Sequence, residues 1–458
     1  MYKTDTICAV ATGLGRSAIG MIRVSGPDAI SVCDGIFKGK KRISEMETFT
    51  AAFGRIMDGD TILDEAVVLV MKAPHTYTTE DTVEIDLHGG TYVVKRVMEL
   101  LIEKGVRTAE PGEFTKRAFL GGRIDMTEAE AVMDVINAET NMALSASVNQ
   151  LTGQLRTEIG QLREKVLYNT AYIESALDDP ENYSLDGFDE KLDLTIREVI
   201  EKVDELLKTS DEGRMIKEGI KTAIVGRPNA GKSSILNLLL GENRAIVTDI
   251  EGTTRDTLEE YVSIDGIMLK LIDTAGIRDT ADAVEQIGVE RARQSVEEAD
   301  LVLLILDGSE DLTANDVEIM KLLEGKKTLI LINKSDKEQL ITEEVVRKEA
   351  GSDEIIIPMS AVTGEGLDDL KNMIRSLFFR EEIDYNNQVY ITSARNKESL
   401  LNAKHSLEKV RESIAEGLGE DFYTIDLMAA YESLGEIIGE TLEDDLADKI
   451  FSEFCMGK

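Results

Sequence analysis

One short segment constrains the fold of this chain more than any other feature. Residues 226 to 233 read Gly-Arg-Pro-Asn-Ala-Gly-Lys-Ser, a pattern typical of phosphate-binding loops. The segment follows an apolar run at 222–225 and precedes a run at 234–240 that has the spacing of a helix. A strand that delivers such a loop to a helix N-terminus turns backbone N–H groups toward phosphate oxygens. The context therefore predicts a nucleotide-binding domain of the α/β class.

The side chains of this loop suit a nucleoside triphosphate bound with Mg²⁺. The Lys232 ammonium can reach the outer phosphates, which makes Lys232 a candidate catalytic residue, and the Ser233 hydroxyl can hold Mg²⁺. The residues expected to contact the nucleotide are Asn229, Ala230, Gly231, Lys232, Ser233 and Ser234.

Two segments farther along the chain predict the remaining contacts to Mg²⁺ and the γ-phosphate. Residues 252 to 256 read Gly-Thr-Thr-Arg-Asp in a region with few core residues, and Thr254 there can coordinate Mg²⁺. The second segment ends a strand-like run, where a carboxylate can hold Mg²⁺ through water and a glycine N–H can bond the γ-phosphate. It consists of Asp273, Thr274, Ala275 and Gly276.

Two more strand ends predict which base is bound. Residues 333 to 336 read Asn-Lys-Ser-Asp, and the Asp336 carboxylate can accept hydrogen bonds from the N1–H and amino groups of guanine. Adenine has no such pair of donors, so a buried unpaired carboxylate would reject it. Asn333 and Lys334 belong to the same motif, and Ser360 with Ala361 would close over the base. Together these elements predict a site for GTP.

The groups expected to drive hydrolysis differ from those of Ras-like GTPases. There, a Gln after the Asp-x-x-Gly glycine orients the attacking water, whereas this chain has Ile277, which cannot do so. Arg255 and Arg278 are candidates for an arginine finger, and the sequence does not decide between them. Glu285 is our candidate for positioning water, and its alternative interpretation is a residue on a surface helix.

A monovalent cation could supply the positive charge that an arginine finger gives elsewhere. Asn229 offers a side-chain carbonyl near the β- and γ-phosphates, and backbone carbonyls of the 248–253 loop could complete its coordination shell. The carbonyls expected to take part are those of Thr248, Ile250 and Thr253.

The composition argues against several classes of protein. The 458 residues include 51 basic and 88 acidic ones, a net charge of −37, so we do not expect a broad basic surface that grips nucleic acid unaided. The one dense basic run, residues 38 to 42, is typical of a solvated loop. Three widely spaced cysteines predict neither a disulfide framework nor a zinc site. No apolar run approaches the ~20 residues that span a bilayer, so we expect a cytoplasmic protein.

Hydrophobic periodicity divides the chain into four segments. Short β-like runs and a helix predict an α+β domain over residues 1–120. Helical spacing occupies 121–215 and disappears near 211–213. Strands then alternate with helices over 216–380, the signature of a mostly parallel sheet with helices on both faces. Helical stripes return at 381–458, so we expect the nucleotide-binding domain to be inserted into a helical domain whose two parts pack together.

These motifs resemble the tRNA-uridine-modification GTPase family known as MnmE or TrmE, and the resemblance covers the whole chain. Besides the nucleotide-site motifs, it rests on Gly-Met-Ile-Arg-Val-Ser-Gly at 20–26, His-Gly-Gly at 88–90 and Pro-Gly-Glu-Phe-Thr at 111–115. The chain ends with Cys-Met-Gly-Lys, where the family usually has Cys-Ile-Gly-Lys, so Met456 is a departure from the pattern.

The resemblance implies a GTPase that dimerises across its switch regions under potassium stimulation, with Asn229 as a potassium ligand and Glu285 as the residue that activates water. It also implies that the N-terminal domain binds tetrahydrofolate and holds a constitutive homodimer. Cys455 would lie near the folate and is a candidate catalytic residue. By position, a 5-formyl- or 5,10-methylene-tetrahydrofolate would contact Arg23, Glu80, Arg123 and Lys458.

A partner and a reaction are implied as well. The partner resembles MnmG or GidA, an FAD- and NADH-dependent protein, and the pair would place an aminomethyl or carboxymethylaminomethyl group on carbon 5 of the tRNA wobble uridine. Methylene-tetrahydrofolate would give the carbon, and GTP hydrolysis would be coupled to the reaction. Two alternatives stay open at this point. One is a regulatory or ribosome-assembly GTPase whose flanking domains only bind partners, and the other is a folate-dependent one-carbon transferase with an accessory GTPase.

Overall fold

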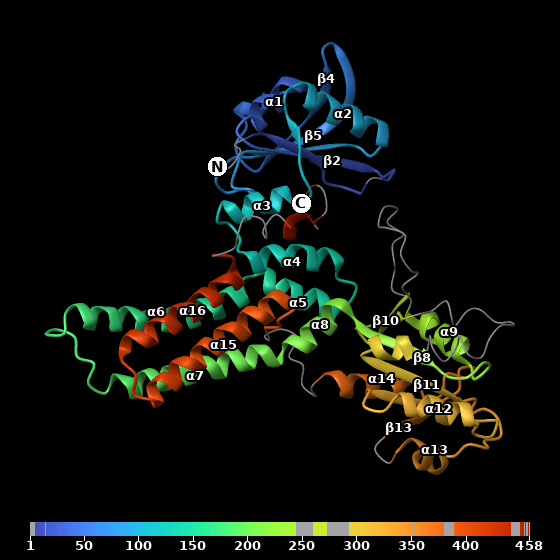
Figure 1. Ribbon diagram of the computed structural model, residues 1–458. Coiled ribbons are helices and arrows are strands. Elements are labelled where there is room, and N and C mark those ends of the chain that lie inside the picture. Colours follow the sequence, from blue (N-terminus) through green and yellow to red (C-terminus); the bar gives the residue numbers. More distant parts are fainter. Residues whose placement is uncertain are drawn as a thin grey trace. The chain divides into compact units, whose positions relative to one another are not determined.

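The chain forms two compact units, each assembled from separated stretches of sequence. The computed structural model, drawn in Figure 1, describes residues 5–13, 15–243, 260–272, 293–351, 354–379, 389–440, 449–452, 454 and 457. The first unit comprises residues 1–133, 151–193 and 405–458, and the second comprises 134–150 and 194–404. None of the described helices is long and apolar enough to cross a membrane.

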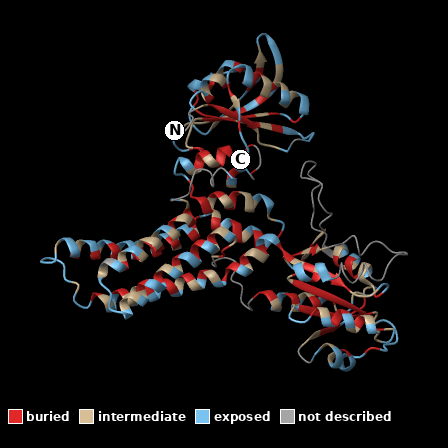
Figure 2. Ribbon diagram, viewed as in Figure 1, coloured by how far each residue is buried: buried red, intermediate tan, exposed pale blue. Residues whose placement is uncertain are grey.

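The first unit contains a seven-stranded sheet of order β3-β4-β5-β6-β2-β1-β7. Its neighbouring strands are antiparallel, except that β1 and β7 are parallel. Alternate residues of the strands form a core with helices α1 and α2, which cover one face (Figures 1 and 2). The elements are β1 (Ile7–Val10), β2 (Ile19–Ser25), α1 (Ala29–Ile36), β3 (Phe37–Gly39), the 3₁₀ helix η1 (Ile43–Glu45), β4 (Thr50–Asp58), β5 (Thr61–Met71), β6 (Thr82–His88), α2 (Thr91–Glu103) and β7 (Arg107–Thr108).

Helices α6 and α16 of the same unit pack side by side, although they are far apart in sequence (Figure 1). Arg163 of α6 is nearly buried; its Nη1 lies 2.6 Å from a Glu440 oxygen, and its guanidinium lies 4.1 Å from the Tyr431 ring centroid. Helices that precede and follow the phosphate-loop region therefore pack together, as the sequence predicts. In the two units together, the helices before and after the phosphate-loop region are α3 (Glu113–Leu120), α4 (Met126–Asn137), α5 (Asn141–Leu151), α6 (Gln154–Asp178), α7 (Phe188–Lys208), α8 (Ser210–Glu218), α15 (Ala394–Ala415) and α16 (Glu420–Ile438).

The second unit is built around a six-stranded sheet of order β13-β12-β11-β8-β10-β9. Neighbouring strands are parallel, except that β9 runs antiparallel to β10 at one edge. One apolar core joins the sheet to α9 and α14, and a second core joins its other face to α12 and α13. This arrangement confirms the predicted class. The elements are β8 (Ile220–Val225), α9 (Lys232–Asn243), β9 (Glu260–Ile264), β10 (Ile267–Ile272), β11 (Leu301–Asp307), α12 (Ala314–Leu322), β12 (Thr328–Asn333), α13 (Glu343–Ala350), β13 (Ile355–Pro358) and α14 (Leu367–Phe378).

The structure contradicts the sequence prediction at residues 211–213, where helical spacing was expected to disappear. Helix α8 instead continues through Gly213 as far as Glu218. A β-carbon at Gly213 would overlap the carbonyl oxygen of Ile391, so this glycine lets the helix approach the later segment of chain closely. Gly213 therefore serves packing and does not mark the end of the helix.

Four strands, β3, β4, β7 and β9, were not predicted from the sequence, and β3 and β7 have only three and two residues. In β4, apolar residues such as Ala52 and Phe53 occupy both faces, so the strand lacks a clear alternation of polar and apolar residues. β9 is short, and its place in the sheet depends on antiparallel pairing with β10, a contact that local sequence does not reveal.

The packing at Gly213 predicts that Gly213→Ala destabilises the protein. Alanine usually stabilises a helix interior by about 1 kcal/mol relative to glycine, but overlap with a packed backbone costs about 1–3 kcal/mol. The matched control is Gly160→Ala in α6, where a β-carbon would meet nothing within 4 Å. Urea unfolding followed by circular dichroism should show a lower midpoint for Gly213→Ala and an equal or higher one for Gly160→Ala. A rise in both midpoints would contradict the described packing.

Candidate nucleotide-binding site

The phosphate-binding loop joins β8 to α9 at the carboxyl ends of the parallel strands, where ligands of such sheets bind (Figure 1). Because α9 begins at Lys232, its first N–H groups and the positive end of its dipole face the loop. Lys232 Nζ donates to the carbonyl oxygens of Gly226 at 2.7 Å and Arg227 at 2.9 Å. Burial lowers the pKa of the Lys232 ammonium. Since both of these acceptors are neutral carbonyl groups, an anion such as phosphate would stabilise the charged form of Lys232.

Asn333, at the end of β12, joins the phosphate-binding loop to a second loop. Its Nδ2 donates to the carbonyl oxygen of Ala230 at 2.9 Å, and its Oδ1 accepts from the N–H of Ala361 at 3.1 Å. The residue is buried, so both ends of the amide are satisfied by backbone groups. Gly231 has φ +103°, and a β-carbon there would overlap Asn333 Nδ2. Glycine at this position is therefore required for the contact.

Lys334, the next residue, is held by a carboxylate that the sequence prediction did not include. Its backbone adopts φ +68°, and Nζ forms an ion pair with Asp307 at the end of β11. The Asp307 carboxylate also accepts from the backbone N–H of Ser309 at 3.0 Å and from its hydroxyl at 2.7 Å. Burial alone would raise the pKa of Asp307, but the hydrogen bonds from Lys334 and Ser309 hold it below its usual value. Asp307 therefore remains an anion that fixes the Lys334 stem.

Asp336 lies exposed at the same end of the sheet, where it can meet a ligand. Ser360 Oγ donates to its Oδ1 at 2.6 Å, which orients the carboxylate. Ser335, between Lys334 and Asp336, donates its N–H to the carbonyl oxygen of Met359 at 3.0 Å. The two loops after β12 and β13 are thus fastened to each other, and Asp336, Ser360 and Ala361 are brought together as the sequence predicts.

Ion pairs hold the other side of the phosphate-binding loop. Arg227 Nη2 lies 2.8 Å from a Glu310 carboxylate oxygen, and Arg227 Nε lies 4.0 Å from Asp316. Asp316 is buried and forms a capping box with Thr313 at the start of α12. The loop is therefore anchored to α12 through Arg227 and to β12 through Asn333.

The remaining candidate residues divide into two groups. Asn229 lies exposed in the loop with φ +64°, a left-handed conformation that asparagine tolerates better than most residues, and Ser233 and Ser234 lie in the first turn of α9. The candidates that lie outside the described residues are Thr248, Ile250, Thr253, Thr254, Arg255, Asp273, Thr274, Ala275, Gly276, Arg278, Glu285, Cys455 and Lys458.

A second polar cluster lies in the N-terminal sheet, on the face opposite to α1 and α2. The guanidinium carbons of Arg23 and Arg123 lie 5.8 and 4.9 Å from the centroid of the same Tyr77 ring. Arg23 Nε donates to Glu84 at 2.9 Å, and its Nη1 donates to the carbonyl oxygen of Gly457 at 3.1 Å. Two of the predicted folate contacts thus share one aromatic ring, beside the C-terminal segment of the chain.

Glu80, the third predicted folate contact in the described residues, is paired within the protein. Its carboxylate accepts from Arg117 Nη1 at 3.0 Å and from the hydroxyl of Ser25 at 2.8 Å. Arg117 is buried and also contacts Asp5 and Glu113, both at 2.9 Å. This network fixes the direction of the Glu80 carboxylate.

Sequence reasoning missed Asp307, Tyr77 and Arg117. Asp307 directly follows the apolar run 301–306, so its position at a strand end, like that of Asp273 and Asn333, was a usable signal. Arg117 and Tyr77 carry no such signal, because their roles depend on contacts between segments distant in sequence.

Two family models match most of the chain. A model of the GTP-binding protein TrmE N-terminus matches residues 6–123, and a model of the MnmE helical domain matches residues 126–455. The solved G domain of the T. maritima FeoB iron transporter is 26% identical to this chain, of which it covers 34%, with 97% of that domain aligned and a TM-score of 0.26.

Full-length relatives agree with the two family models. The tRNA modification GTPase MnmE of Lachnoclostridium phytofermentans is 50% identical, with 100% of both chains covered. The proteins of the same name from Thermoanaerobacter pseudethanolicus and Bacillus subtilis are 46% and 44% identical, with at least 99% of each chain covered. The chain therefore belongs to the MnmE (TrmE) family of GTPases that take part in tRNA modification.

Proposed function

We propose that this chain is a potassium-stimulated, Mg²⁺-dependent cytoplasmic GTPase that works as a homodimer with an FAD- and NADH-dependent partner of the MnmG type. The pair adds an aminomethyl or carboxymethylaminomethyl group to C5 of the tRNA wobble uridine and takes the carbon from a bound tetrahydrofolate. One observation carries the proposal: Asn333 joins the phosphate-binding loop to the loop that is expected to bind guanine. The chain that contains this contact aligns over its whole length with a tRNA modification GTPase. The domain boundaries that we propose are 1–120, 121–215, 216–380 and 381–458.

Several contacts support a guanine nucleotide at the first site. The N–H groups at the start of α9 and the Lys232 ammonium would face the phosphates, and Ser233 would hold Mg²⁺ together with Thr254 and Asp273. Lys334, fixed by Asp307, would pack against the base, whereas Asp336 would accept its donors. Mg²⁺, when bound, neutralises charge on the β- and γ-phosphates.

Asn229 supports a potassium ion beside the phosphates. The residue is exposed and left-handed in the loop, so its side chain is not consumed by packing. A cation ligated there would offset the negative charge that develops on the transferred phosphoryl group, the role of an arginine finger elsewhere. Glu285 remains the proposed residue for positioning water.

The Arg23 cluster supports a folate in the N-terminal domain. Arg23 and Arg123 place positive charge around Tyr77, which suits an aromatic ligand with a carboxylate tail. Glu80 is oriented by its hydrogen bond from Arg117 and can accept from the amino edge of a pterin. Cys455 and Lys458 follow in the same C-terminal segment, whose Gly457 contacts Arg23.

The whole proposal is tested by nucleoside analysis of tRNA. Cells that lack the gene should lose the C5-modified wobble uridines, and a plasmid copy should restore them. Liquid chromatography with mass spectrometry of digested tRNA measures both. An unchanged amount of modified uridine in the deletion strain would contradict the proposal. If the deletion strain accumulated ribosomal precursors instead, a ribosome-assembly GTPase would be favoured.

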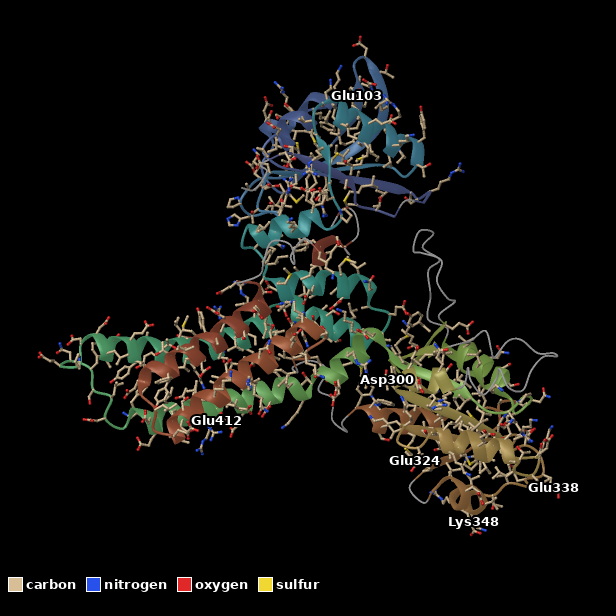
Figure 3. The ribbon with its side chains drawn as sticks, viewed as in Figure 1. Glu103, Asp300, Glu324, Glu338, Lys348 and Glu412 are labelled. Atoms are coloured by element: carbon tan, nitrogen blue, oxygen red, sulfur yellow. The ribbon has the colours of Figure 1, made fainter. Side chains whose placement is uncertain are left out.

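The base-recognition step predicts that Asp336→Asn exchanges guanine for xanthine. An asparagine amide cannot accept both donors of guanine, but it can donate to the 2-oxo group of xanthine. We expect GDP affinity to fall by roughly 10³-fold or more, with xanthosine diphosphate bound in preference, as measured by competition against a fluorescent nucleotide. The matched control is Glu338→Gln, an exposed carboxylate in the same loop (Figure 3). If both variants bind GDP like wild type, Asp336 does not read the base.

The cation step predicts that hydrolysis is faster in KCl than in NaCl at equal ionic strength and that Asn229→Gly abolishes the difference. Glycine keeps the left-handed backbone and removes the whole carboxamide side chain with its oxygen, and the exposed position should tolerate this loss without unfolding. We expect a loss on the order of tenfold or more in the potassium rate, measured as phosphate release. Asn229→Asp, which retains an oxygen, should keep a potassium response. A full potassium response in Asn229→Gly would remove Asn229 from the cation site.

A further inference from the structure

The edge of the N-terminal sheet carries the one dense basic run of this acidic chain. Residues 36 to 56 contain five basic and two acidic side chains, against a net charge of −37 for the whole protein. Strand β3 is the edge strand, and Lys38, Lys40, Lys41 and Arg42 are all exposed on it or directly after it. We propose that this basic edge, together with Arg55 and Phe53 of β4, holds the phosphate backbone and an unstacked base of the tRNA substrate.

The three lysines of this edge are available to a partner. Arg42 pairs with Asp34 at 2.8 Å and Arg55 with Glu65 at 3.3 Å. Within the described part of the chain, by contrast, no carboxylate lies within ion-pair distance of Lys38, Lys40 or Lys41. Three such ammonium groups close together in sequence form a positive field that attracts a polyanion.

The edge is also anchored at both ends, which distinguishes it from the freely solvated loop that the sequence predicted. Before the lysines, the Phe37 ring packs directly over Gly39 and Gly54, where any side chain would overlap it. After them, Asp34 accepts from the backbone N–H of Ile43 at 2.6 Å. Because the backbone is already ordered, binding a phosphate backbone here costs little conformational entropy.

The register of the sheet places an aromatic ring among the charges. Lys38 lies directly opposite Arg55 on β4, so both side chains are on the same face of the sheet. Phe53 is two residues from Arg55, on the same face and diagonal to Lys38, and its exposed fraction is 64%. Exposed aromatic rings beside cations are the combination with which proteins hold unstacked bases of single-stranded RNA.

A tRNA anticodon loop offers both features, a phosphate backbone and splayed bases, whereas an acidic protein surface offers no bases for Phe53. The inference rests on the proposed tRNA substrate and adds the surface that holds it. The alternative role of lysines on an edge strand is to prevent pairing between sheets of two molecules, and the experiment below separates the two.

The test compares full-length wild type with the triple variant Lys38→Gln, Lys40→Gln, Lys41→Gln. The matched control is Lys104→Gln, Lys321→Gln, Lys348→Gln, which removes the same charge from exposed lysines elsewhere (Lys348 is labelled in Figure 3). Anisotropy of a labelled, unmodified tRNA transcript over about 50–200 mM KCl gives the affinity and its salt dependence. Light scattering gives the oligomeric state, and GTP hydrolysis reports folding. Each triple variant is also returned to the deletion strain for nucleoside analysis.

We expect the edge variant to bind tRNA about tenfold more weakly or worse, with a salt slope smaller by about two to three, and the control variant to bind like wild type. Phe53→Ala should weaken binding about fivefold or more. Equal affinity and slope in the edge and control variants would overturn the inference, as would a change in oligomeric state with tRNA affinity unchanged. If wild type restores the modified uridine while tRNA affinity does not depend on the edge, the inference alone fails; if wild type does not restore it, the proposed function fails.

Discussion

The nucleotide site depends on one buried amide. Asn333 donates to the carbonyl of Ala230 and accepts from the N–H of Ala361, so it fixes the distance between the phosphate-binding loop and the loop that follows β13. A buried amide that lost either partner would leave a polar group unpaired at a cost of about 1–3 kcal/mol. The contact also explains Gly231, since no side chain fits against Asn333 there. The two loops proposed to bind the phosphates and the base are therefore joined by one residue, although Asn333 and Ala230 are 103 residues apart in sequence.

Paired charges around this amide make the site rigid in a chain with a large excess of acid. Asp307 positions Lys334, and Glu310 positions Arg227. Each of these cations lies close in sequence to residues that are proposed to face the ligand. The N-terminal cluster uses the same device, because the buried Arg117 fixes Glu80. In both places a charged side chain is positioned by an ion-pair partner from a distant segment of the chain. Such pairs fix geometry more than they add stability, since desolvation offsets much of their attraction.

The sequence predicted the parts of the site that are local. Three motifs each lie at the end of an apolar strand: the phosphate-binding loop, the Asn-Lys-Ser-Asp motif and Ser360 with Ala361. The sequence of each motif indicates its chemistry, and the apolar run before it indicates its place at the edge of the sheet. Strand β9 and the partners Asp307 and Arg117 could not be predicted in the same way. Their roles arise from pairing across the sheet or from ion pairs between distant segments, and such contacts leave no periodic pattern. The prediction at Gly213 was wrong for a related reason. Glycine disfavours a helix interior, and the close approach of Ile391, which explains why glycine stands there, cannot be inferred from local sequence.

Helix α8 connects the nucleotide sheet to the helices that precede it in sequence. On one side, Arg214 forms hydrogen bonds to both carboxylate oxygens of Asp300, at 2.8 and 3.4 Å, where β11 begins, and Asp300 also accepts from the N–H of Lys221 in β8. Figure 3 labels Asp300 at this junction. On the other side, Lys217 lies 2.9 Å from Asp134. β8 leads directly into the phosphate-binding loop. A shift of the loop that moved β8 would therefore also act on α8, through the hydrogen bonds of Asp300 to Lys221 and Arg214. Helix α8 is thus tied by ion pairs both to the sheet that delivers the phosphate-binding loop and to Asp134 in α4.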